Sequence, residues 1–182
     1  MNSISANLNV MIKAAEKASK ILIRDFGELE KLQVSTKGPL DFVTNSDRKA
    51  EKVILNELSK SRKKYCILSE EIGEIKNSDK DNFWIIDPID GTTNFLHGIP
   101  HFAICIAHMS KNEIISGLIF DPIKDEMFFS EKNKGAYLNN QRLRVSKKNS
   151  IEDCLFSSNH EGAKFSNLNM RCSGCAALDL AY

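Results

Sequence analysis

The N-terminal part of the chain carries apolar residues at helical spacing, and this pattern limits the folds open to it. One face of a predicted helix is marked by Ile4, Leu8, Met11, Ala15, Ala18 and Leu22. Gly27 is a suitable C-terminal stop for this helix. A second helix is predicted to begin near Thr44, and its inward-facing residues are Val53, Ile54 and Leu58. Two amphipathic helices at the start of a chain need a surface that covers their apolar faces.

Short strand-like runs follow the helices and indicate that this surface is a sheet. The predicted strands cover 65–68, 83–86, 102–108, 114–120, 126–130 and 154–157, with a hairpin at Asn139-Asn140. Helices first, and then strands at short spacing, favour layered α and β structure over regular βαβ units.

Charge and composition exclude several classes of protein. Basic residues number 25 and acidic residues 24, so the net charge favours neither a nucleic acid nor a membrane as a partner. Residues 1–10 lack the features of a signal peptide, and no run approaches the roughly 20 apolar residues that cross a bilayer. Cys172 and Cys175 form a C-x-x-C pair, but a structural zinc needs two further ligands. Five scattered cysteines therefore indicate reduced thiols in a cytoplasmic protein.

The most informative stretch is W-I-I-D-P-I-D-G-T-T-N-F at residues 84–95. An apolar run ends in Asp87 and Asp90, and Pro88 biases the residue before it towards extended backbone. Gly91 allows the backbone to approach a ligand closely. A helix that begins at Thr92 or Thr93 would direct free N–H groups at a phosphate. Two hard acids beside an anion-binding turn are typical of a magnesium site.

Each acidic motif, taken alone, also has a purely structural interpretation. Asp-Pro and Asp-Gly pairs mark ordinary turns. The D-x-V-T-x-x-D motif that ends at Asp47 contains a possible capping box. Glu70 and Glu71 are compatible with a solvated loop.

Taken together, these motifs resemble the inositol monophosphatase family, a group within the magnesium-dependent, lithium-sensitive phosphatase superfamily. The D-x-V-T-x-x-D motif, the Glu70-Glu71 pair and the stretch at 84–95 occur in the order and at the spacings of that family. The similarity continues to Gly174-Cys175-Ala176-Ala177 and covers nearly the whole chain. It implies an α+β fold with a layered αβαβα architecture, a mostly antiparallel sheet and C-terminal layers that are incomplete. Residues 1–182 would form a single domain of this kind, truncated at its C-terminal end.

The resemblance also implies a ligand set for two or three Mg²⁺ ions. Glu70, Asp87 and the backbone carbonyl of Ile89 would hold the first ion, and Asp87 and Asp90 the second. Asp47 and Thr92 would orient a metal-bound water, with Glu70 also counted among the catalytic residues.

The substrate would be a small phosphorylated molecule. Residues expected to contact its phosphate or its alcohol part are Asp90, Gly91, Thr92, Thr93, Gly174, Cys175 and Ala176. The implied protein is a homodimer.

Mg²⁺-dependent hydrolysis of a phosphate monoester, such as an inositol monophosphate, is thus the leading interpretation. The family pattern continues beyond Tyr182 and there supplies another ligand to the second metal, so we expect that metal to bind weakly. The alternatives are an inactive product and a non-catalytic protein that binds RNA or the transcription machinery. The basic segment at 132–148 would serve RNA binding, but a solvated hairpin is the favoured interpretation, because no aromatic platform accompanies the charges.

Overall fold

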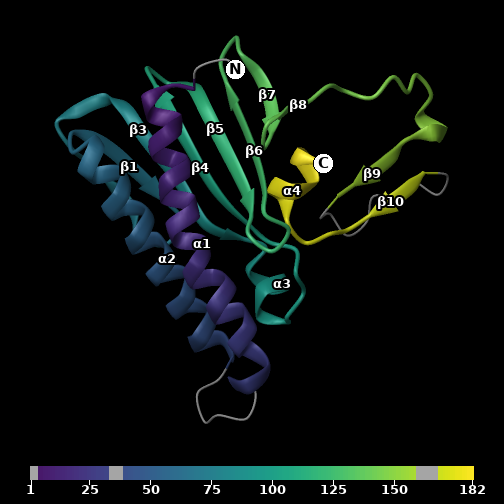
Figure 1. The fold of residues 1–182 in the computed structure, drawn as a ribbon, viewed down its shortest axis with the longest axis horizontal. Helices are drawn as coiled ribbons and strands as arrows, with labels where there is room; N and C mark the ends of the chain where they lie inside the picture. The colour runs from purple at the N-terminus through teal and green to yellow at the C-terminus, as the bar shows by residue number, and fades with distance from the viewer. Residues whose placement is uncertain (1–3, 33–38, 159–167) are drawn as a thin grey trace.

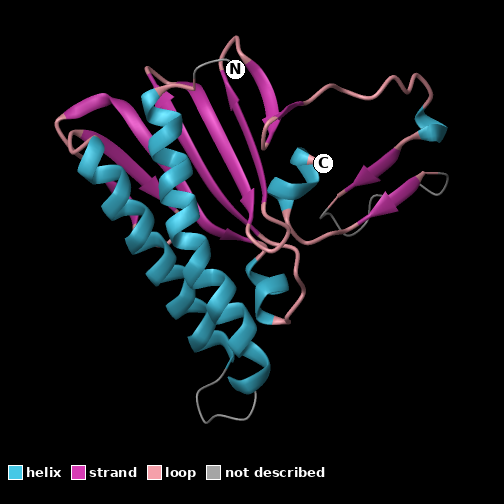
Figure 2. Ribbon diagram, viewed as in Figure 1, coloured by secondary structure: helices cyan, strands magenta, loops and turns pink. Residues whose placement is uncertain are grey.

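The computed structural model describes residues 4–32, 39–158 and 168–182 and has an α+β fold. Two long helices lie side by side across one face of an eight-stranded sheet (Figures 1 and 2). A short C-terminal helix and a two-stranded sheet lie next to the last strands of the large sheet, away from the two long helices. This arrangement confirms the predicted layered α and β structure.

The two long helices are α1 (Ala6–Leu32) and α2 (Pro39–Ser61). The predicted stop at Gly27 is wrong, because α1 continues through this glycine and buries Leu29 two residues later. No atom lies within 4 Å of the place where a Cβ of Gly27 would be, so the glycine serves no close contact. The predicted start of α2 near Thr44 is also too late, because Pro39 begins the helix and its fixed φ suits a first turn.

The large sheet has the strand order β2-β1-β3-β4-β5-β6-β7-β8. Its strands are β1 (Tyr65–Ser69), β2 (Gly73–Ile75), β3 (Asp79–Asp90), β4 (Ala103–Ser110), β5 (Glu113–Asp121), β6 (Glu126–Glu131), β7 (Gly135–Leu138) and β8 (Gln141–Arg142). β1 and β3 are parallel, and the other neighbours in this sheet are antiparallel. The hairpin predicted at Asn139-Asn140 joins β7 and β8, whereas β2 was not predicted.

The remaining elements lie near the C-terminal end of β3 or beyond the large sheet. They are α3 (Thr92–Leu96), a 3-10 turn (Ile151–Asp153), β9 (Leu155–Ser157), β10 (Asn169–Arg171) and α4 (Ala176–Ala181). β9 agrees with the strand predicted there, and its parallel partner β10 was not predicted. No helix in the described part of the chain combines the length and apolar character that a bilayer crossing requires.

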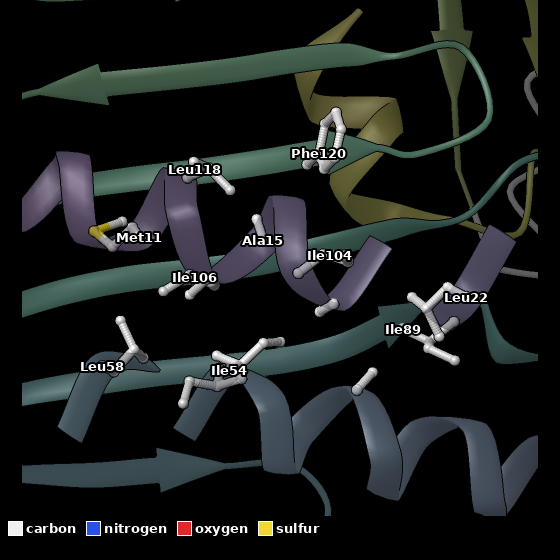
Figure 3. Close-up of a cluster of buried hydrophobic side chains, with 14 of the residues drawn as sticks. Met11, Ala15, Leu22, Ile54, Leu58, Ile89, Ile104, Ile106, Leu118 and Phe120 are labelled. Carbon is white, nitrogen blue, oxygen red and sulfur yellow. The ribbon is translucent and has the colours of Figure 1, made fainter. Parts of the chain in front are cut away.

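The main core fills the space between the two helices and the sheet (Figure 3). Leu8, Met11 and Leu22 of α1 are fully buried, as the helical periodicity predicts, and they belong to one cluster with strand residues such as Ile104. Burying a side chain of this size contributes roughly 1.5–3 kcal/mol. This layer therefore provides a rigid base for the strand ends.

A second, smaller cluster lies on the opposite face of the sheet. Ala103 and Phe128 pack there against Cys175 and Leu178 at the start of α4. Because side chains alternate along a strand, Ile104 faces the helices while its neighbour Ala103 faces α4. The C-terminal segment thus meets the face of the sheet that α1 and α2 leave free.

Candidate active site

An irregularity in strand pairing places the two aspartates of the D-P-I-D motif on one face of the sheet. Asp87 is paired with Cys105 and Asp90 with Ala103, so three steps along β3 match two steps along β4. Residues directly opposite each other in antiparallel strands point to the same face, and Cys105 and Ala103 share a face. Both carboxylates therefore face the α4 side, while Ile89 between them is buried in the main core.

Gly91 makes the turn from β3 into α3, and only glycine suits its position. Its φ of 93° lies in the left-handed region. A Cβ there would lie 3.1 Å from the carbonyl oxygen of His101 and 3.2 Å from the Cβ of Cys175. α3 begins at Thr92, as predicted, and the Thr92 hydroxyl donates to the Ile89 carbonyl oxygen at 3.0 Å.

The first turn of α4 and the residue before it dock directly onto Asp90. The Ala177 N–H donates to Asp90 Oδ2 at 2.6 Å, and the Cys175 thiol donates to the same oxygen at 3.1 Å. Asn94 supports this contact, because its side-chain amide donates to the carbonyl oxygens of His101, at 2.7 Å, and Ser173, at 2.8 Å. Gly174, Cys175 and Ala176 are thus brought to the strand end that carries Asp90.

Glu70 reaches the same strand end from the turn after β1. Its backbone N–H donates to the carbonyl oxygen of Ile86, the residue before Asp87, at 3.1 Å. Burial of Asp87 raises the pKa of its carboxyl group, and the neighbouring charges of Glu70 and Asp90 raise it further. The Glu70 carboxylate is close enough for its charge to act on Asp87. These two predicted ligands are therefore neighbours.

Asp47 on α2 is buried and faces the acidic turn after β1. Burial, followed by the charges of Glu71, Glu70 and Glu51, raises the pKa of Asp47 to about 7. An acid with a pKa near neutrality can accept or release a proton under physiological conditions, as a residue that orients a water requires.

The donor chemistry of this cluster fits magnesium. In the described part of the chain, no ion pair joins Glu70, Asp87 or Asp90 to a basic side chain. Carboxylate and carbonyl oxygens are the ligands that Mg²⁺ prefers, and a cation would remove the mutual repulsion of the acids. Among the same described residues, no three His, Cys, Asp or Glu side chains already converge closely enough to hold an ion. The ligand set with the Ile89 carbonyl thus stays a prediction.

A cavity of about 450 Å³ lies beside the cluster on the α4 face. Asp87 and Cys105 line one end of it, and its other walls are mostly apolar. A second cavity, of about 750 Å³, lies between α1 and β5–β7 and includes none of the predicted site residues. We place the candidate site beside the smaller cavity, because its lining includes Asp87 and Ala177, whereas the lining of the larger cavity includes no predicted site residue.

One acidic residue near the site was missed by the sequence reasoning. Glu51 is buried on α2, one helical turn after Asp47, and its carboxylate accepts hydrogen bonds from the turn that carries Glu70. The four-residue spacing of Asp47 and Glu51, which puts both on one face of a helix, was the available signal.

The basic segment at 132–148 is partly neutralised within the fold. Lys132 pairs with Glu113, and Lys134 pairs with Glu131 at 3.0 Å. The Arg142 guanidinium lies over Gly135, where a Cβ would come within 3.1 Å of it. Fewer free charges remain for RNA than the sequence indicates.

The fold and the site define an α+β protein with an acidic, oxygen-rich centre at the C-terminal end of a central strand. The sequence profile of the inositol monophosphatase family matches residues 4–182, and the chain belongs to this family.

Similar proteins carry two kinds of name. The chain is 47% identical to the inositol-1-monophosphatase of Rhizobium meliloti over 194 residues, which cover 98% of this chain and 73% of the relative. It is 36% identical to the Nus factor SuhB of Escherichia coli K12, over 96% of this chain and 71% of that relative. The crystal structure of the extragenic suppressor protein suhB from Bartonella henselae superimposes with a TM-score of 0.88 at 47% identity, over 98% of this chain and 74% of that one.

Proposed function

We propose that this protein hydrolyses a small phosphate monoester, of the inositol monophosphate class, with the help of magnesium. The observation that carries this proposal is the pairing irregularity that gathers Asp87 and Asp90 on one face beside Glu70. Membership of the inositol monophosphatase family and the relative named inositol-1-monophosphatase support the same activity.

The carboxylates of Glu70, Asp87 and Asp90 and the carbonyl of Ile89 would hold two or three magnesium ions. Magnesium supplies neutralisation of phosphate charge and activation of a water for in-line attack. The Ala177 N–H at Asp90 Oδ2 holds that carboxylate in place on the α4 side.

Asp47 and Thr92 would act on the water. The Thr92 hydroxyl donates its proton to the Ile89 carbonyl, so its oxygen lone pairs are directed to accept a hydrogen bond from the water. Asp47, with a pKa of about 7, would accept the proton that the water loses as it attacks phosphorus.

The substrate would lie between the turn at Gly91 and the segment before α4. The first amides of a helix have no acceptor within the helix, and those of Thr92 and Thr93 would bind phosphate oxygens together with that of Gly91. Gly174, Cys175 and Ala176 would contact the alcohol part, because this segment is docked on Asp90.

The test is Mg²⁺-dependent release of inorganic phosphate from a panel containing inositol monophosphates, sugar bisphosphates and 3′-phosphoadenosine nucleotides. Asp87→Asn should lower turnover about 100-fold or more, since a lost ligand removes several kcal/mol of charge stabilisation. Asp79→Asn, at the opposite end of the same strand, is the matched control and should keep turnover within about twofold. Activity that is indifferent to Asp87 would refute the mechanism.

A second function, binding to RNA or to the transcription machinery, is favoured by the relatives named Nus factor SuhB. Arg144 and Lys147 are exposed in the basic segment and would contribute to it. Salt-dependent RNA binding that is lost on replacing Arg142 and Arg144 with alanine would establish this function. The acidic centre plays no part in it, so the two functions can be separated by variants.

We further propose that the protein works in the cytoplasm as a homodimer. The resemblance to the family supports this state, and exposed apolar side chains such as Leu180 and Tyr182 are available for association. Light scattering coupled to size-exclusion chromatography would distinguish a dimer from a monomer.

A further inference from the structure

A three-residue turn between two paired strands carries Glu70. Ser69 at the end of β1 is paired with Gly73 at the start of β2, which leaves 70–72 as the turn. One side of this turn is attached to β3 through the hydrogen bond from the Glu70 N–H to the Ile86 carbonyl. The direction of the Glu70 side chain therefore depends on what holds the other side.

Glu51 of α2 holds that other side with a single carboxylate oxygen. The Ser69 hydroxyl donates to Glu51 Oε1 at 2.5 Å, and the Ile72 N–H donates to the same atom at 3.2 Å. Glu51 thus bonds the residue immediately before Glu70 and the last residue of the turn. Together with the bond to Ile86, these contacts fix the backbone on both sides of Glu70.

The burial of Glu51 indicates that these bonds are the reason for a carboxyl group at this position. Its side chain is 2% exposed, and within the described part of the chain no cation pairs with it. A buried carboxylate costs several kcal/mol unless hydrogen bonds satisfy it. A side chain needed only to fill this place between α2 and the sheet would be apolar.

We propose that Glu51 is a positioning residue, which acts through the turn at 70–72 to aim Glu70 at the magnesium site. The inference rests on the proposed function, because it assigns Glu51 to the same metal centre. Groups that hydrogen-bond the supports of a metal ligand commonly govern its affinity. Ser69 shares this role as the donor on the near side of the turn.

Two measurements test the proposal, and one of them needs no metal. Hydrogen–deuterium exchange of the metal-free protein reports the Ile72 amide, and calorimetry reports Mg²⁺ binding. The variants are Glu51→Ala, which removes the acceptor, Glu51→Gln, which keeps an uncharged acceptor oxygen, and Ser69→Ala. The matched control is Glu57→Gln on the same helix, where Glu57 pairs with Lys17 near the surface.

Glu51→Ala should expose the Ile72 amide to faster exchange and weaken Mg²⁺ binding about tenfold. Glu51→Gln should show a smaller change in the same direction, because a bond to a charged acceptor is about twice as strong as a neutral one. At saturating Mg²⁺, turnover and the KM for the phosphate ester should return to within about twofold of the wild type, as expected of a residue that touches neither substrate nor metal. Glu57→Gln should match the wild type throughout.

The proposal is overturned if both Glu51 variants retain wild-type exchange at Ile72 and wild-type Mg²⁺ affinity. It is also overturned if Glu57→Gln weakens Mg²⁺ binding equally, since the effect would then be one of helix stability. Should Glu51→Ala fail to fold, Glu51→Gln alone decides between these outcomes. A wild type that binds no Mg²⁺ at all would instead refute the proposed function. The exchange rate of the Ile72 amide would in that case still show whether Glu51 holds the turn at 70–72.

Discussion

Asp25 on α1 and Asp87 on β3 are two sheltered carboxylates with opposite surroundings. Asp25 is 1% exposed and has two cations beside it, Arg24 at 2.7 Å and Lys49 at 3.4 Å. The Ser46 hydroxyl also donates to it at 2.9 Å. Burial acts to raise the pKa of Asp25, but these partners outweigh burial and lower it.

Asp87 has the reverse environment. Burial raises the pKa of Asp87, and its charged neighbours Glu70 and Asp90 raise it further, while the hydrogen bond from the Ile89 N–H opposes them. Burial therefore does not decide the state of a carboxylate by itself; the sign of the nearest charges does. Asp25 is thus an acid whose cationic and hydroxyl partners link α1 to α2, whereas Asp87 is an acid surrounded by like charges.

The largest expected effect on stability is the destabilisation caused by replacing Asp25. Asp25→Asn should lower the free energy of unfolding by about 1–3 kcal/mol, because it removes a charged acceptor from three donors, of which two are half exposed. Urea denaturation at neutral pH measures this difference. An unchanged midpoint would show that the cluster is not the link between the helices.

The pH dependence of that loss sharpens the comparison. The pKa of Asp25 is lower in the fold than in the unfolded chain, so its contribution is present above the unfolded value of about 4 and is lost as the pH falls through the folded value. The stability difference between wild type and Asp25→Asn should thus shrink below about pH 4. A stability difference between wild type and Asp25→Asn that stays constant from about pH 3 to about pH 7 would contradict this assignment.

The next effect has the opposite sign. In metal-free protein, Asp87→Asn should raise the free energy of unfolding by about 1 kcal/mol, since it removes a partly screened repulsion from Glu70 and Asp90. Thermal unfolding in a chelating buffer would detect it. Destabilisation by this variant would mean that Asp87 is compensated in the same way as Asp25, and the comparison would fail.

The smallest effect is expected at Cys105, the neutral neighbour of Asp87 across the strand pair. Burial raises the pKa of the Cys105 thiol, so this side chain stays uncharged. Cys105→Ser should change Mg²⁺ affinity less than about twofold, because it alters neither charge nor size appreciably. A larger loss, seen by calorimetry, would show that the centre depends on the thiol itself.

Local sequence patterns were sufficient to predict secondary structure where a single strong sequence signal was present. The D-P-I-D-G sequence predicted two acids at the end of a strand and a helix from Thr92 or Thr93. β3 does end at Asp90 and α3 begins at Thr92, although β3 is longer than the predicted run at 83–86. The end of α1 could not be read in this way. A glycine costs a helix about 1 kcal/mol, and the burial of Leu29 beyond Gly27 outweighs that cost, which only the packed structure reveals.

Contacts between distant segments were beyond sequence patterns altogether. The docking of Ala177 on Asp90 and of Glu51 on the turn at 70–72 depends on tertiary placement. The resemblance to the family suggested the segment 174–176, whereas it did not suggest Glu51. The four-residue spacing places Glu51 on the same helix face as Asp47, but it does not indicate which turn Glu51 contacts.

The position of Ile89 between Asp87 and Asp90 has a consequence for distant substitutions. Its backbone belongs to the acidic centre, whereas its side chain lies beside Leu22 of α1 in the main core (Figure 3). A smaller side chain at position 22 would leave a space beside Ile89 and so weaken the support of that stretch of β3. A selection for altered catalysis would then recover changes in the first helix, on the far face of the sheet from the carboxylates.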